Sequence, residues 1–191
     1  MRRLTIHESS TAPTRLLHNS TLWAEVLPAT IESDPGFPPT NPTAPRLIVR
    51  SHRAVTDAES AFAAWSSAGW EAFDAGVARV LDGASVPVLI WPGPGSMLSD
   101  AISTLSFARR QPGVGLVIDP VAWISASMHE NASEHLARFA RALLGCPTVA
   151  CVVVRPCAGA GLDLGSVASA LDPLVRRVGV VATTESDHHP S

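Results

Sequence analysis

Short apolar runs rich in β-branched residues recur through the chain after residue 46. Continuous runs of this kind predict strands that are buried on both faces, as they are in a parallel sheet. The five runs lie at residues 47–49, 86–90, 114–118, 149–154 and 178–181.

Longer segments with helical periodicity separate these runs, at residues 56–81, 99–110, 133–144 and 164–175. Thr56 and Ser133 are candidate N-caps, and each is followed by an acidic residue, which the positive end of the helix dipole favours. Gly83 and Gly145 follow two of the expected helix ends. Each segment therefore fits a helix that connects one parallel strand to the next.

This alternation predicts an α/β domain of repeated βα units around a parallel sheet. Two architectures fit the pattern: a shortened or partial barrel of the TIM type, and an open doubly wound sheet. A full TIM barrel typically has about 250 residues. The 191 residues present here therefore indicate a shortened barrel, a half-barrel completed by a partner, or a sheet that has opened.

The first 45 residues follow a different pattern. Residues 4–6 predict a short strand, and the spacing of Leu22, Val26 and Leu27 predicts a helix over about residues 21–31. Five prolines in the next segment exclude helix and central strand there, so a linker or long surface loop is expected. The expected organisation is a βα-like segment at residues 1–32, a Pro-rich linker or loop at 33–45, a βα-repeat domain at 46–185 and a flexible tail at 186–191.

The composition narrows the class of protein. Hydrophobic residues make up 46% of the chain and charged residues 16%, as in a packed globular domain. No apolar run reaches the ~18 residues that a membrane helix needs, so no membrane association is expected. The N-terminal residues lack the pattern of a secretory signal, and the three cysteines suit reduced thiols, which predicts a cytoplasmic protein.

Charge and missing residue types exclude several functions. The net charge is −3 and the fourteen basic residues form no stripe, so nucleic acid is not an expected partner. All fourteen are arginines, and the absence of Lys and Tyr excludes a lysine Schiff base and a tyrosine acid. His129 and His135 match no standard zinc spacing, and no serine lies in a nucleophile elbow of the hydrolase type.

In both architectures ligands bind at the carboxyl ends of the parallel strands, so the residues after each apolar run are the candidates for a site. The candidates for a rim that binds a phosphate or carboxylate are Arg50, His52, Arg53 and Arg155. As an alternative, these side chains pair with local acids.

Gly93, Gly95 and Ser96 precede an expected helix, where backbone amides would hold a phosphate, although the same segment also fits a plain turn. Trp91 and Trp123 would stack on a sugar face or fill the space above the core.

In order and spacing, the strand ends resemble the second half of the xylose-isomerase-like barrels, the sugar-phosphate isomerase and epimerase superfamily, over about residues 46–185. Leu47-Ile48-Val49-Arg50 is similar to a strand of that family that ends in arginine, and residues 88–96 are similar to a strand that ends in a metal-binding glutamate. Residues 112–119, Pro-Gly-Val-Gly-Leu-Val-Ile-Asp, resemble the family's Pro-Asn-Val-Gly-Leu-x-Leu-Asp. Residues 159–164, Gly-Ala-Gly-Leu-Asp-Leu, followed by a helix and the run at 178–181, resemble its Gly-x-Gly-x-Ile-Asp turn and closing strand.

The resemblance implies a divalent cation held by carboxylates and histidines at successive strand ends, but most of those positions are changed here. Asp119 matches its aspartate, whereas the glutamate position carries Trp91 and the histidine of the Asp-x-x-His element is Ala122. The next histidine falls near Val153, the following aspartate near Pro156, and the closing glutamate near Thr184, one residue before Glu185. We therefore expect no bound metal and no other cofactor, and the changed positions argue against an active enzyme.

The resulting prediction is a degenerate member of the superfamily, a pseudoenzyme that binds a small anionic or sugar ligand or a protein partner. One alternative is an active metal-dependent isomerase or epimerase, in which Asp119, Glu185 and His52 would be the catalytic residues and would transfer a proton next to a carbonyl. Asp119 would equally serve as a cap for the loop that follows it. The other alternative is a structural subunit that completes a barrel in a homo-oligomer or with a partner chain.

Overall fold

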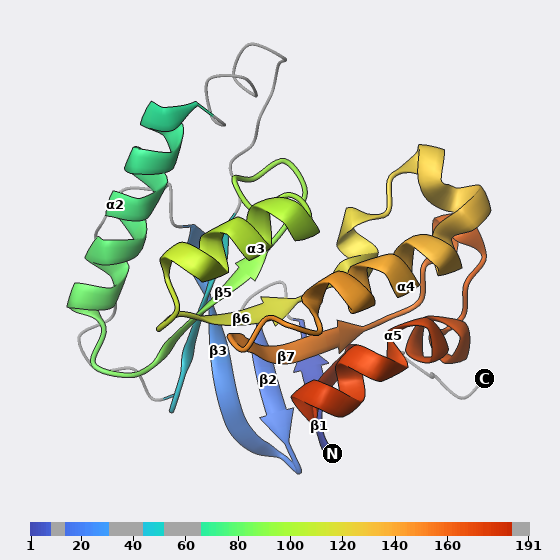
Figure 1. Ribbon diagram of the computed structural model, residues 1–191. Helices are drawn as coiled ribbons and strands as arrows, with labels where there is room; N and C mark the ends of the chain where they lie inside the picture. The colour runs from blue at the N-terminus through green and yellow to red at the C-terminus, as the bar shows by residue number, and fades with distance from the viewer. Residues whose placement is uncertain (9–13, 31–43, 52–65, 185–191) are drawn as a thin grey trace.

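The computed structural model of the protein describes residues 1–8, 14–30, 44–51 and 66–184 (Figure 1). The predicted tail and most of the predicted linker lie outside these residues. The strands form one closed barrel in chain order. They are β1 (Arg2–His7), β2 (Arg15–His18), β3 (Thr21–Thr30), β4 (Leu47–Ser51), β5 (Val88–Pro92), β6 (Gly115–Ile118), β7 (Val149–Val154) and β8 (Val180–Thr184).

The sheet is mixed because β2 runs against its neighbours. β2 pairs antiparallel with β1 and β3, and every other neighbouring pair is parallel, including the closing pair of β1 with β8. The prediction of an α/β barrel is confirmed, and the open doubly wound sheet is wrong. The parallel pairing predicted for the five later strands holds for β4 to β8. β2 was not among the predicted strands. The sheet closes within one chain, so its closure requires no second copy.

The helix predicted over about residues 21–31 is wrong, because residues 21–30 form the long strand β3. A two-residue turn at Asn19 and Ser20 joins β2 to β3, and both residues have positive φ, at 48° and 64°. Trp23, Ala24, Val26 and Leu27 are all buried. A strand buried on both faces has no period of two in its apolar residues, which explains why spacing alone indicated a helix.

The four helices predicted between the later strands are present in the described residues: α2 (Ser67–Gly83), α3 (Ala101–Arg110), α4 (Ala132–Leu143) and α5 (Leu164–Val178). The predicted start of the first helix at Thr56 lies outside the described residues. The N-cap predicted at Ser133 is wrong, because α4 begins one residue earlier and Asn131 precedes it. None of the helices in the described ranges is long and apolar enough to cross a membrane.

The barrel separates two cores. Alternate strand residues fill its interior, among them Leu4, Ile6, Ile48, Leu89, Val117, Cys151, Val153 and Ala182. The residues between them pack outward against the helices in a larger core that includes Val49, Ile90, Ile118 and Val152. Figure 1 shows α3, α4 and α5 along the side of β5, β6 and β7. β1, β2 and β3 follow one another in the chain with no helix between them in the described residues.

Candidate ligand-binding site

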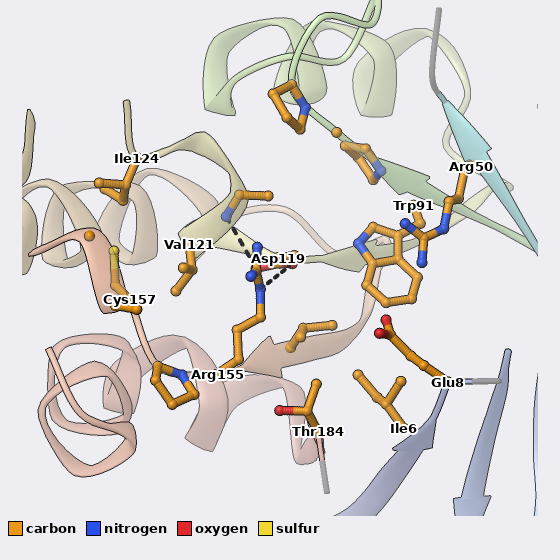
Figure 2. A pocket seen from close by; sticks show the side chains of 18 of the residues that line it. Ile6, Glu8, Arg50, Trp91, Asp119, Val121, Ile124, Arg155, Cys157 and Thr184 are labelled. Atoms are coloured by element: carbon orange, nitrogen blue, oxygen red, sulfur yellow. Dashed lines mark hydrogen bonds and ion pairs between the residues drawn. The ribbon is translucent and has the colours of Figure 1, made fainter. Parts of the chain in front are cut away.

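A cavity of about 880 Å³ opens at the carboxyl ends of the parallel strands. Figure 2 shows side chains from six strand ends around it: Glu8, Arg50, Trp91, Asp119, Arg155 and Thr184. Parallel strands that close into a barrel bring their carboxyl ends to one mouth, which is why residues far apart in the sequence meet here. The rule that ligands bind at the carboxyl ends of parallel strands, here called the strand-end rule, thus pointed to the place where this cavity lies.

Asp119 and Arg155 form an ion pair in the lining of the cavity. Arg155 Nε donates to Asp119 Oδ2 at 2.9 Å, and the amide of Ala122 donates to Asp119 Oδ1 at 3.3 Å. Burial raises the pKa of the Asp119 carboxyl, and Arg155 acts in the opposite direction because its positive charge stabilises the carboxylate. Asp119 thus caps the short helix η1 (Pro120–Trp123) and also holds Arg155 in place.

Arg50 and Trp91 form the second feature of the lining. They face each other in the register of β4 and β5, and the Arg50 guanidinium carbon lies 4.7 Å from the centre of the Trp91 ring, a cation–π contact. Trp91 is buried and Arg50 is exposed. The contact leaves the N–H edges of the Arg50 guanidinium available to an acceptor in the cavity.

The positions at which the resemblance implies metal ligands all line this cavity. They are Trp91, Asp119, Ala122, Val153, Pro156 and Thr184. Of these, Asp119 alone carries a carboxylate, and its Oδ2 already accepts from Arg155. Within the described ranges, no group of three or more His, Cys, Asp and Glu side chains is arranged to hold a metal ion. The described residues therefore do not fit a divalent cation, which needs several converging oxygen or imidazole donors.

Glu8 and His129 are among the lining residues that were not predicted as part of a site. Glu8 directly follows β1, so the strand-end rule would have found it had the rule been applied to the N-terminal strand. His129 lies in η2 (Ala126–Asn131), and its ring packs against Gly159. A Cβ atom at Gly159 would lie 2.5 Å from His129 Cε1, so only glycine permits this approach. The position of His129 depends on a loop conformation that periodicity does not predict.

The structure brings some of the predicted site residues together and leaves others apart. Gly93 lines the cavity, whereas Gly95 and Ser96 are not in its lining. The hydroxyl of Ser96 donates to the carbonyl of Gly93 at 2.8 Å and accepts from the amide of Leu98 at 3.1 Å, so it stabilises the turn.

Trp123 lies in the outer core, edge-on to Phe139 with 5.7 Å between ring centres, and it does not reach the cavity. The three remaining predicted residues, His52, Arg53 and Glu185, lie outside the described residues.

Comparison of the chain with protein-family models, with curated proteins and with solved structures gives no match.

Proposed function

We propose that the protein binds a small anionic ligand of the sugar-phosphate class in the cavity at the barrel mouth, without a divalent cation. The observation that carries this proposal is the convergence of the positions where the resemblance implies metal ligands. They line one cavity, but most of them carry side chains that cannot coordinate a metal. Arginines supply the positive charge in the same lining.

Two guanidinium groups have donors to offer an anion. Arg155 uses Nε for Asp119, and its two terminal nitrogens make no hydrogen bond with the described residues. Arg50 contacts Trp91 by its face, and no ion pair of the described residues involves it. Guanidinium groups bind phosphate and carboxylate oxygens through paired N–H donors, which makes these two arginines the anchors for the ligand.

The remaining lining suits the uncharged part of such a ligand. Trp91 offers an aromatic surface, and Thr184 and His129 add groups that can exchange hydrogen bonds with hydroxyls. Glu8 and Asp119 contribute carboxylates, so the lining is mixed in charge and favours a ligand with both anionic and hydroxyl groups. All three cysteines are free thiols, which supports a reducing compartment such as the cytoplasm.

The test is a screen of phosphorylated sugars against their unphosphorylated counterparts by thermal shift, followed by calorimetry. A ligand at a hundred times its Kd should stabilise the fold by about 2.7 kcal/mol. Arg50→Gln should weaken binding about tenfold, because a charge-assisted pair of hydrogen bonds is lost. Arg138→Gln is the matched control: it removes an exposed arginine paired with Glu134 on α4, and it should leave the affinity unchanged.

Treatment with EDTA should not alter the affinity. The proposal is wrong if a stoichiometric divalent cation copurifies beside Asp119, or if the protein isomerises a sugar phosphate and loses that activity on metal removal. Equal affinity for phosphorylated and unphosphorylated sugars would also overturn it, since the arginines would then play no part.

A further inference from the structure

A second pocket, of about 320 Å³, lies at the opposite end of the barrel, where the parallel strands begin. Its lining comes from the start of β1, the turn between β2 and β3, and the residues just before β4. The antiparallel direction of β2 creates it, because that strand ends at the edge where its neighbours start. The pocket is therefore separate from the cavity of the proposed function.

The side chains of this pocket are positively charged or neutral. Arg2, His18 and Arg46 line it, and none of its lining residues is an aspartate or glutamate. This contrasts with the whole chain, whose net charge is −3. No ion pair of the described residues involves Arg2 or Arg46, and Glu25 on the adjoining part of β3 is paired with Arg15 at 3.8 Å. Two arginines thus face one pocket without a carboxylate partner among the described residues.

Trp23 orients one of these arginines. The Arg46 guanidinium carbon lies 4.9 Å from the centre of the Trp23 ring, a stacked contact that leaves the N–H edge of the guanidinium free. Trp23 is itself buried, and its indole N–H has no acceptor among the described residues. The guanidinium groups of Arg2 and Arg46 thus offer the pocket N–H donors that no carboxylate of the described residues accepts from, as an anion-binding site requires.

We propose that this pocket binds a phosphate group, either inorganic phosphate or a phosphomonoester. Arg2 and Arg46 would hold its oxygens, and the side chains of His18, Asn19 and Thr21 supply further donors around it. The volume exceeds that of a single phosphate ion, so the pocket also has room for a small group esterified to it.

Tryptophan side chains give each site its own reporter. Trp23 lines the second pocket and Trp91 lines the cavity at the other end, so their indole N–H signals in a ¹⁵N spectrum separate the two sites. The Trp23→Phe and Trp91→Phe variants assign these signals among those of the five tryptophans. Titration with inorganic phosphate, and separately with glycerol phosphate, should shift the Trp23 signal saturably at millimolar concentration, whether or not the Trp91 signal moves.

Arg46→Gln and Arg2→Gln should each weaken the phosphate effect on Trp23 about tenfold. Arg3→Gln is the matched control, because Arg3 is the exposed neighbour of Arg2, has the same charge and does not line the pocket. Arg50→Gln should leave the Trp23 response intact, which keeps this proposal separate from the proposed function.

The inference is overturned if millimolar phosphate leaves the Trp23 signal unmoved. It is equally overturned if Arg3→Gln weakens the response as much as Arg2→Gln does, since the effect would then reflect net charge. In each variant, an unchanged spectrum of the indoles outside the substituted pocket shows that the fold is intact.

Discussion

Asp119 is buried at the carboxyl end of β6, and the cation that pairs with it among the described residues is the guanidinium of Arg155. Taking a carboxylate out of water costs several kcal/mol unless a partner compensates. The side chain of Arg155 is 38% exposed, so solvent shares in the compensation. The pair is thus part of the stability of the barrel as well as of the lining of its cavity.

Replacing Arg155 with leucine should destabilise the protein by about 1–3 kcal/mol at pH 7, less than for a fully buried pair because solvent screens the exposed guanidinium. Burial already raises the Asp119 pKa, and loss of the cation raises that pKa further. An acid whose pKa is higher in the folded state favours folding at low pH, and this contribution is lost as the pH rises through the folded pKa. The free energy of unfolding of the Arg155→Leu variant should therefore be close to that of the unchanged protein at around pH 4. The full difference between the two should appear at neutral pH, and urea unfolding at both pH values measures it.

Arg176→Leu is the control for this experiment. It also removes an arginine paired with an aspartate, Asp172, but both lie on the exposed surface of α5, so no measurable change is expected. The double variant Asp119→Asn, Arg155→Leu should recover part of the lost stability, because a neutral amide needs no cation. Equal losses in the two arginine variants, independent of pH, would contradict the explanation.

The location of a single residue could be predicted from the sequence where the residue directly follows a predicted parallel strand. Asp119, Arg50, Trp91 and Arg155 end parallel strands, and the strand-end rule placed them at one mouth. Trp123 follows Asp119 by four residues, but the turn of η1 directs it to the outer core. Local turns of this kind depend on contacts such as the Asp119 cap, which periodicity does not contain.

At the level of elements, the apolar runs after residue 46 predicted every later strand, because strands buried on both faces have continuous apolar sequences. The same rule applied to residues 21–30 would have indicated a strand, but the segment also matched a helical spacing. The better signal was Asn19-Ser20 between two apolar segments, since a two-residue loop of turn-forming residues favours a hairpin.

The hairpin turn itself can be improved. Ser20 has φ of 64°, a conformation that costs an L-residue free energy and costs glycine little. Ser20→Gly should therefore stabilise the protein by about 0.5 kcal/mol, which urea unfolding can measure. Ser133→Gly is the control: Ser133 is exposed in the first turn of α4, where glycine should destabilise by about 0.5 kcal/mol. Destabilisation by both changes would show that the turn does not adopt this conformation.

The whole molecule closes a barrel of eight strands with 191 residues, fewer than the roughly 250 of a typical TIM barrel. The hairpin explains part of this shorter chain length. β1, β2 and β3 occupy residues 2–30, because antiparallel neighbours need no crossover helix. Closure depends on β1 pairing with β8, strands at opposite ends of the chain. Such a non-local pairing leaves no trace in local periodicity, so the sequence could not decide between closed and open sheets.

A closed barrel has no edge strand from which to fray, so its interior should open only when the whole sheet unfolds. Cys151 tests this, because its thiol is fully buried inside the barrel and burial raises its pKa to about 12. In a variant with Cys151 as its one cysteine, alkylation at pH 8 should increase with urea as steeply as global unfolding does.

A second variant, with Cys157 as its one cysteine, is the control: Cys157 lines the mouth cavity and should react faster and with little dependence on urea. The free energy of unfolding should also fall as the pH rises above about 9 toward 12, because the folded protein holds the Cys151 proton that the unfolded chain releases. A weak urea dependence for Cys151 would mean that the barrel opens locally, and the pairing of β1 with β8 would be the first place to look for that opening.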